Sequence, residues 1–274
     1  MLPIQKAPGV TVGIAWWCAM ACLGTSAALA QPPGQAAAAA PAGQLAADST
    51  LRIVALGDST TATAQDWAPE IREVYADCLP RALAARGIKA VVINAGIGDT
   101  TTRDAVARLD RDVRRHRPDL VVVQFGINDS WIDVDEGKSQ PRLTRAEYRK
   151  NLRAIIRRER QDGASVVLMT PNSMRWKDPF YLKAFREHPG LLDVSDARGI
   201  DKLLETYAQD ARDVARSESV PLVDVFRAFE DYGAAPGRSI DEILLASDGI
   251  HPNQAGQALV CKLLASRITD VVRR

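Results

Sequence analysis

From Leu51 onward, short apolar runs alternate with longer amphipathic stretches. Five of the runs are rich in Val and Ile, and most are apolar throughout rather than at every second position. They occupy residues 53–56, 91–93, 120–125, 166–169 and 222–225. Strands buried on both faces have this pattern, which is typical of a parallel sheet covered by helices. The runs therefore predict five buried strands of a parallel sheet.

Between the runs, apolar residues recur at the spacing of amphipathic helices. Four such stripes occupy residues 106–113, 148–156, 203–214 and 259–271. Thr144 and Glu147 precede the second stripe with the spacing of a capping box, which marks a helix start. Alternating strands and helices predict one doubly wound α/β domain, a three-layer α/β/α sandwich. Residues 171–198 and 227–247 lack a clear period and are expected to be long connections that shape a substrate pocket.

The first 48 residues do not have the pattern of a folded domain. Lys6, an uncharged apolar stretch and the sequence Ala28-Leu29-Ala30 predict a signal peptide over residues 1–30, cleaved after Ala30. An uncleaved membrane anchor and a lipoprotein acylated at Cys22 are the alternatives. Residues 31–48 are rich in Ala, Pro, Gly and Gln and predict a linker. The folded domain is expected over residues 49–274, in a secreted or periplasmic protein.

The charge of the chain is balanced, with 35 Lys and Arg against 34 Asp and Glu. A net charge of +1 gives no electrostatic reason to expect nucleic acid or an anionic membrane as a partner. No stable membrane contact is expected once the signal peptide is removed. The chain has three His and four Cys, and the Cys residues lack zinc-site spacing, so we expect no zinc site and no site with several His ligands. The sequence does not indicate an oligomeric state.

Four polar clusters follow predicted strands or precede the last predicted helix. They are Gly-Asp-Ser-Thr at 57–60, Asn-Ala-Gly-Ile-Gly-Asp-Thr at 94–100, Gly-Ile-Asn-Asp at 126–129 and Asp-Gly-Ile-His-Pro at 248–252. Doubly wound sheets bind their ligands at the carboxyl ends of the strands. The four clusters are therefore expected to meet at one functional edge.

The side chains in these clusters are those needed for acyl transfer. Ser59 is a candidate nucleophile that needs a base, His251 is a suitable base, and Asp248 could orient the imidazole. A tetrahedral intermediate also needs hydrogen-bond donors for its oxyanion. The backbone N–H of Ser59, the amide of Asn128 and a backbone N–H of the turn at 94–100 are the candidates.

The four blocks GDS, NxGxGDT, GxND and DxxHP, in this order, resemble those of the SGNH (GDSL-type) hydrolases. The resemblance covers residues 51–272 and implies a flavodoxin-like five-stranded sheet and hydrolysis of esters or O-acetyl groups without a cofactor. The resemblance implies that Ser59 is the nucleophile, His251 the base, Asp248 the carboxylate that orients the base, and Asn128 an oxyanion donor. Asp99 stands where relatives often have a second Gly. Gly98 is the expected backbone donor of this turn, with Asp99 and Gly96 as alternatives.

In a flavodoxin-like sheet, the first and last helices lie on the same face. Cys78 falls in the first helical region and Cys261 early in the last. Two buried free thiols are the expected outcome for this pair. Because export permits disulfides, a Cys78–Cys261 bridge is the alternative.

An exported serine esterase that removes small acyl groups, above all O-acetyl groups on carbohydrates, fits these features best. The chain has no long apolar lid segment, which disfavours a long-chain lipase. Trp131, Arg175 and Trp176 are candidates for substrate contact. An acyltransferase acting on cell-envelope glycans and a lysophospholipase or thioesterase remain alternatives. A metallophosphoesterase lacks its His ligands, and a non-catalytic glycan-binding protein would not need all three of Ser59, His251 and Asp248.

Overall fold

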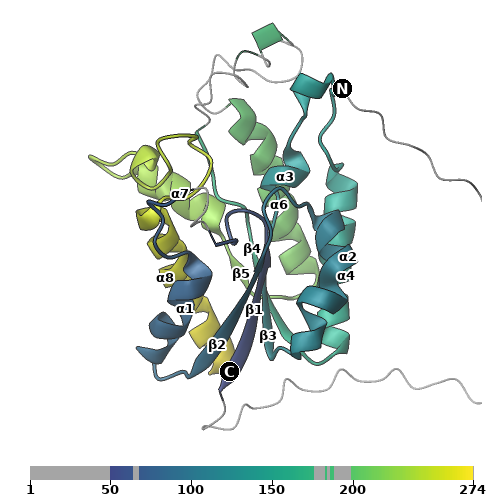
Figure 1. Ribbon diagram of the computed structural model, residues 1–274, viewed down its shortest axis with the longest axis vertical. Coiled ribbons are helices and arrows are strands. Elements are labelled where there is room, and N and C mark those ends of the chain that lie inside the picture. The colour runs from purple at the N-terminus through teal and green to yellow at the C-terminus, as the bar shows by residue number, and fades with distance from the viewer. Residues whose placement is uncertain (1–49, 64–67, 176–182, 184–185, 188–198, 274) are drawn as a thin grey trace, which may run out of the picture. The chain divides into compact units, whose positions relative to one another are not determined.

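Figure 1 presents a computed structural model of the protein, which describes residues 50–63, 68–175, 183, 186–187 and 199–273. These residues lie in one compact unit, Pro41–Arg274. The predicted signal peptide and linker fall outside the described residues, as does Trp176. Among the helices that the structure describes, none has the length and apolar character needed to cross a membrane.

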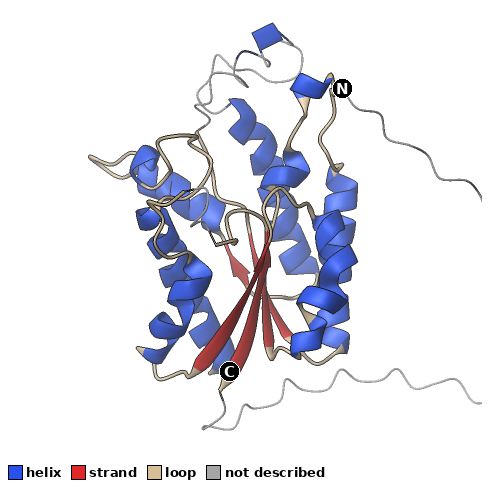
Figure 2. Cartoon of the chain, in the orientation of Figure 1, coloured by secondary structure: helices blue, strands red, loops and turns tan. Residues whose placement is uncertain are grey.

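Five strands form one parallel sheet, as the apolar runs predict (Figure 2). They are β1 (Leu51–Gly57), β2 (Ala90–Gly96), β3 (Leu120–Gln124), β4 (Ser165–Met169) and β5 (Leu222–Val223). The strand order β2-β1-β3-β4-β5 is that of a flavodoxin-like sheet, so the expected fold class is confirmed. In this order the chain switches direction across the sheet between β1 and β3, and ligands bind at such a switch point.

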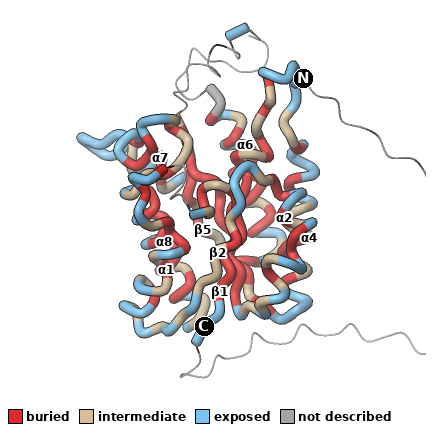
Figure 3. Tube along the Cα trace, viewed as in Figure 1, coloured by how far each residue is buried: buried red, intermediate tan, exposed pale blue. Residues whose placement is uncertain are grey.

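Helices cover both faces of the sheet. One layer contains α1 (Tyr75–Ala84), α7 (Val225–Ala234) and α8 (Gln254–Val272); the other contains α2 (Thr102–Asp112), α4 (Arg145–Gln161) and α6 (Gly199–Ser217). Each layer buries its own apolar cluster against the strands, whose residues are mostly buried (Figure 3). Burial at about 25 cal/mol per Å² of apolar surface makes these two clusters the main source of the fold's stability.

The expected capping box is present at the start of α4. The Thr144 hydroxyl accepts a hydrogen bond from the Glu147 backbone N–H, and the Glu147 carboxylate accepts one from the Thr144 backbone N–H.

The expectation that residues 227–247 are a long connection is wrong in part. Residues to Ala234 belong to α7, and the short helix η3 (Ile240–Glu242) follows. The last predicted strand is also shorter than expected, since Val225 begins α7.

Cys78 of α1 and Cys261 of α8 form a disulfide, with their Cα atoms 6.3 Å apart. The expectation of two buried free thiols is therefore wrong, and the alternative holds. The two helices pack directly against each other on one face of the sheet. Their contact brings the two Cβ atoms within reach of a bridge, which requires Cα separations of about 4.4–6.8 Å.

Candidate active site

Ser59 lies on a tight turn that follows β1. Asp58 Oδ1 accepts hydrogen bonds from the backbone N–H and the hydroxyl of Thr60, at 2.9 and 2.8 Å, and this bracing fixes the turn. Burial raises the pKa of Asp58, although these hydrogen bonds oppose the rise. Gly96 packs so closely on this turn that a Cβ would lie 2.3 Å from the Ala62 nitrogen. The end of β2 is thereby held against the Ser59 turn.

Ser59, His251 and Asp248 form one chain of hydrogen bonds. Ser59 Oγ lies 2.9 Å from His251 Nε2, although 192 residues separate them in the sequence. His251 Nδ1 lies 2.7 Å from Asp248 Oδ2. The side chains of His251 and Asp248 are 20% and 24% exposed, so the pair is largely shielded but reachable from solvent. The structure thus brings together the three residues that the sequence singled out for acyl transfer.

The segment that carries Asp248 and His251 is fixed by its own backbone and by the loop after β4. Asn172 Nδ2 donates to the Ile250 carbonyl at 2.8 Å, and the Arg175 N–H donates to the Gly249 carbonyl at 2.7 Å. Burial acts to raise the pKa of Asp248. Hydrogen bonds from the His251 ring and from two backbone N–H groups, together with the imidazolium charge, outweigh burial and hold that pKa below its usual value.

The three residues proposed as oxyanion donors, Ser59, Gly98 and Asn128, line one cavity. A Cβ on Gly98 would lie 3.9 Å from Ser59 Cβ, which places the two residues side by side. The N–H groups of Ser59 and Gly98 donate to no other residue that the structure describes. Asn128 Nδ2 donates to the Thr100 carbonyl at 3.1 Å, which uses one of its two hydrogens. Ser59, Gly98 and Asn128 thus each keep one N–H hydrogen that is not donated to any residue the structure describes.

Gly96, the third backbone candidate, is already committed. Its N–H donates to Asn94 Oδ1 at 2.9 Å, while Asn94 Nδ2 donates to the Thr61 carbonyl at 2.8 Å. Asn94 therefore ties the turn after β2 to the turn after β1. Sequence reasoning did not assign this role, although an Asn two residues before a Gly is a known signal of a side-chain-braced turn.

Asp129, next to Asn128, is fully buried and tied to the start of α2. Its Oδ1 accepts hydrogen bonds from the backbone N–H and the hydroxyl of Thr102, whereas its Oδ2 has no partner among the described residues. Burial raises the pKa of Asp129 to about 7. This carboxyl connects the two segments that carry Gly98 and Asn128, and the sequence had assigned it no role.

Asp99 has a left-handed backbone, with φ of 59°, a conformation that Asp tolerates better than most residues. Its carboxylate pairs with Arg142, which also forms an ion pair with Asp133. No sequence signal points to Arg142, because it lies 43 residues from Asp99 in a connecting segment. The ion pair between Asp99 and Arg142 holds the turn in place on the C-terminal side of Gly98.

A cavity of about 400 Å³ opens beside the Ser59 hydroxyl. Its apolar walls come from Ile127, Ile250 and Trp131. Trp131 also packs on a small apolar cluster, so it both lines the cavity and contributes to a local core. Arg175, by contrast, is an internal ion-pair partner of Asp201 and Glu230.

Over the described ranges, no group of three His, Cys, Asp or Glu side chains could hold a metal ion. The arrangement as it stands has the parts for acyl transfer: a hydroxyl, a base within hydrogen-bond reach, a carboxylate behind the base, and donors for a developing oxyanion. All of these parts come from the carboxyl ends of β1, β2 and β3 and from the segment before α8.

Known proteins match this chain in sequence and in fold. The uncharacterized lipoprotein YqeF of Bacillus subtilis is 32% identical over 162 residues, which are 59% of this chain and 65% of that protein. An acetylxylan esterase of Geobacillus stearothermophilus is 25% identical over 178 residues, or 65% of this chain and 71% of the esterase. The chain thus spans about two thirds of the length of these two relatives.

A solved lipase/acylhydrolase from Enterococcus faecalis superposes with a TM-score of 0.61 and 28% identity, covering 81% of this chain and 97% of that one. The sequence profile of the GDSL-like lipase/acylhydrolase family matches residues 55–259, which is most of the chain. The family and the esterase among the relatives support the class of carboxylic ester hydrolases. The resemblance to SGNH hydrolases is confirmed, and the protein belongs to the GDSL-like lipase/acylhydrolase family.

Proposed function

We propose that the protein is a serine esterase in which Ser59 is the nucleophile, His251 the general base and Asp248 the residue that orients the base. The observation that carries the proposal is the continuous hydrogen-bond chain from Ser59 Oγ through His251 to Asp248. A serine hydroxyl is a weak nucleophile, and an adjacent base that is itself oriented by a carboxylate activates it.

In the proposed reaction, Ser59 Oγ attacks the ester carbonyl while its proton moves to His251 Nε2. The electron pair of the carbonyl becomes an oxyanion, which the N–H groups of Ser59 and Gly98 and the amide of Asn128 stabilise. The C–O bond to the alcohol then breaks, and His251 returns the proton to the leaving oxygen. Water repeats the sequence on the acyl-enzyme, releasing the acid and restoring the serine. Each oxyanion donor contributes roughly 3–4 kcal/mol in comparable sites.

The acyl group we propose is small, with acetate as the first choice, and the alcohol is a carbohydrate hydroxyl. A cavity of about 400 Å³ with Ile127 and Ile250 in its walls suits a short acyl chain. An acetylxylan esterase among the relatives adds support. We further propose that residues 1–30 are a cleaved signal peptide and residues 31–48 a linker, so that residues 49–274 act outside the cytoplasm. A relative described as a lipoprotein is consistent with export.

Two measurements test this proposal. A fluorophosphonate probe should label the protein at Ser59, as located by peptide mass, and prior treatment with a small ester substrate should slow the labelling. Release of 4-nitrophenol should then be measured on 4-nitrophenyl acetate and 4-nitrophenyl butyrate, and release of acetate on acetylated xylan. Labelling at another residue would overturn the assignment of the nucleophile. Faster hydrolysis of butyrate than of acetate, without acetate release from xylan, would overturn the proposed substrate.

A further inference from the structure

A second cavity adjoins the one beside Ser59. Its volume is about 650 Å³, within the range of about 300–1,000 Å³ typical of ligand sites. Asp99 and Arg142 line both cavities, so the two spaces meet at this pair. The proposed reaction uses only the first cavity and leaves the second without a role.

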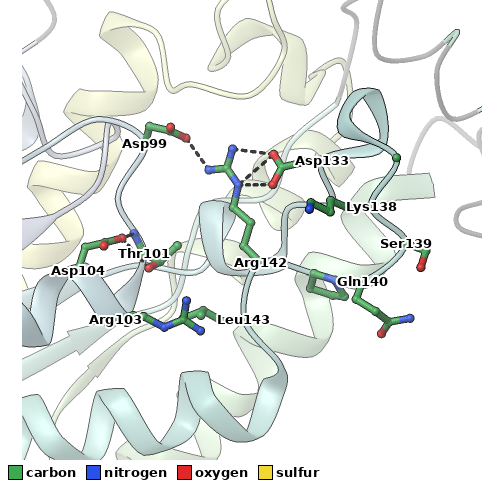
Figure 4. A pocket seen from close by; sticks show the side chains of 12 residues that line it. Asp99, Thr101, Arg103, Asp104, Asp133, Lys138, Ser139, Gln140, Arg142 and Leu143 are labelled. Carbon is green, nitrogen blue, oxygen red and sulfur yellow. Dashed lines mark hydrogen bonds and ion pairs between the residues drawn. The ribbon is translucent and has the colours of Figure 1, made fainter. Parts of the chain in front are cut away.

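The Arg142 side chain lies at the boundary between the two cavities and is held there by ion pairs. Figure 4 shows its guanidinium between Asp99 and Asp133, with ion pairs to both. Arg142 Nε and Nη2 donate to the Asp133 carboxylate at 2.8–3.1 Å, which holds the guanidinium plane in one orientation. The side chain of Asp99 is 79% exposed, so its carboxylate can accept further hydrogen bonds from a ligand that crosses this boundary.

The lining of the second cavity is polar and electrically balanced. Its charged side chains are three acids and three bases: Asp99, Asp104, Asp133, Arg103, Lys138 and Arg142. Equal numbers of opposite charges favour a neutral ligand over a polyanion or a polycation. Pro141 and Leu143 are apolar lining residues, and Leu143 is itself buried, which disfavours an acyl chain in this space.

Several polar groups of this lining are available to a ligand. The side chains of Lys138, Ser139 and Gln140 make no hydrogen bond or ion pair with any residue that the structure describes, and all three are exposed. An ammonium donates, an amide both donates and accepts, and a hydroxyl does either. Sugar hydroxyls are neutral groups that both donate and accept, so they match this mixture better than a fatty alcohol does.

We propose that the second cavity is a binding subsite for the alcohol part of the substrate, specifically a sugar unit next to the one that carries the ester. The acyl group occupies the cavity beside Ser59, and the neighbouring sugar lies past Arg142 against Lys138 and Gln140. This inference rests on the proposed serine esterase function and adds to it a preference for oligomeric over single-ring acetates.

The test compares two esters on the purified protein. 4-Nitrophenyl acetate has no sugar ring to place in the second cavity, whereas O-acetylated xylotetraose has sugar units on either side of an acetylated one. The variant Lys138→Ala/Gln140→Ala removes two exposed side chains from the subsite. Lys150→Ala, an exposed lysine on α4 that lines neither cavity, is the matched control. The quantity measured is the ratio of kcat/KM on the oligosaccharide to kcat/KM on the aryl acetate.

The ratio should fall at least about fivefold in the double variant, mainly through a higher KM for the oligosaccharide, and should stay at its original value in Lys150→Ala. An unchanged ratio in the double variant would overturn the subsite. So would an unaltered protein that hydrolyses the aryl acetate but not the acetylated sugar, and in that case the serine esterase proposal would survive. Inactivity on both esters, without fluorophosphonate labelling, would overturn the proposed function and the subsite together.

Discussion

The carboxylate of Asp248 binds His251 twice. Its Oδ1 accepts the backbone N–H of His251 at 3.1 Å, and its Oδ2 lies 2.7 Å from the ring nitrogen Nδ1. Because both contacts involve one residue, they fix the rotation of the imidazole as well as its tautomer. With Nδ1 protonated, Nε2 is left as the acceptor that faces Ser59.

Replacement of Asp248 by Asn should therefore impair catalysis far more than folding. The Asn amide can donate to Nδ1, which would place the imidazole proton on Nε2 and remove the base. We expect kcat on 4-nitrophenyl acetate to fall by about 10²–10⁴-fold, as in other triads. Steady-state kinetics beside a circular-dichroism melt measure both effects. If Asp248→Asn keeps more than half of the original kcat, the proposed role of the carboxylate is wrong.

Asn128 should contribute to the transition state rather than to substrate binding. Asn128→Ala removes one proposed oxyanion donor, so we expect a loss of about 10²–10³-fold in kcat with a small change in KM. Asn128→Asp keeps the size of the side chain but replaces the donor with an acceptor, and it should be no more active than Asn128→Ala. An effect confined to KM in both variants would contradict the proposed donor role.

Asp129 should make the stability of the protein depend on pH. The pKa of Asp129 is raised by burial from 3.8 to about 7. Between those values the native protein holds a proton that the unfolded chain has released, so the free energy of unfolding should fall as the pH rises from about 4 to about 7. Asp129→Asn cannot titrate, and it should make this slope less negative by at most about 1.4 kcal/mol per pH unit.

Urea denaturation at several pH values between about 4.5 and 6.5 would measure this slope. Glu159 and Asp201, whose pKa values burial raises to about 7 and about 6, contribute in the same direction, as does Asp58, so part of the slope should remain in Asp129→Asn. Asp135→Asn, at an exposed position outside the site, is the control and should keep the original slope. Equal slopes in Asp129→Asn and in the unaltered protein would show that the Asp129 carboxyl titrates normally.

The Cys78–Cys261 disulfide should stabilise the fold by closing a long loop, since 183 residues separate the two cysteines. Chain-entropy arguments assign about 2–5 kcal/mol to such a bridge. Reductant should lower the melting temperature of the unaltered protein but not that of Cys78→Ala/Cys261→Ala. In peptide mapping, alkylation without reductant should leave both residues unmodified. Alkylation of Cys78 or Cys261 in the unfolded, unreduced protein would show free thiols instead.

The location of the candidate site could be predicted because parallel strands end at a common edge. The polar residues that follow β1, β2 and β3 had to lie near one another once the sheet was recognised, and this placed Ser59, Gly98 and Asn128 together. The helical spacing of apolar residues likewise located the helices whose buried face is one continuous apolar stripe. Both inferences depend on local sequence, which is why they could be made without the structure.

Other features depend on contacts between distant segments or on a signal that was overlooked. Arg142 reaches Asp99 and Asp133 through the path of its connecting segment, and no local sequence pattern indicates that path. The disulfide depends on which residues of α1 lie opposite which residues of α8. The knowledge that both helices cover the same face of the sheet does not determine this. The start of α7 did have a local signal, since the Asp224 side chain accepts a hydrogen bond from the Arg227 backbone N–H as a helix cap.

The proposed nucleophile can be tested most directly by turnover of 4-nitrophenyl acetate near neutral pH, with the unaltered protein and Ser59→Ala prepared in parallel. The parallel preparation controls for contaminating esterases, and circular dichroism confirms that the variant folds. We predict that kcat/KM falls by at least about 10³-fold in Ser59→Ala, because the variant lacks the hydroxyl that lies 2.9 Å from His251 Nε2. Equal turnover by the two proteins would contradict the serine mechanism.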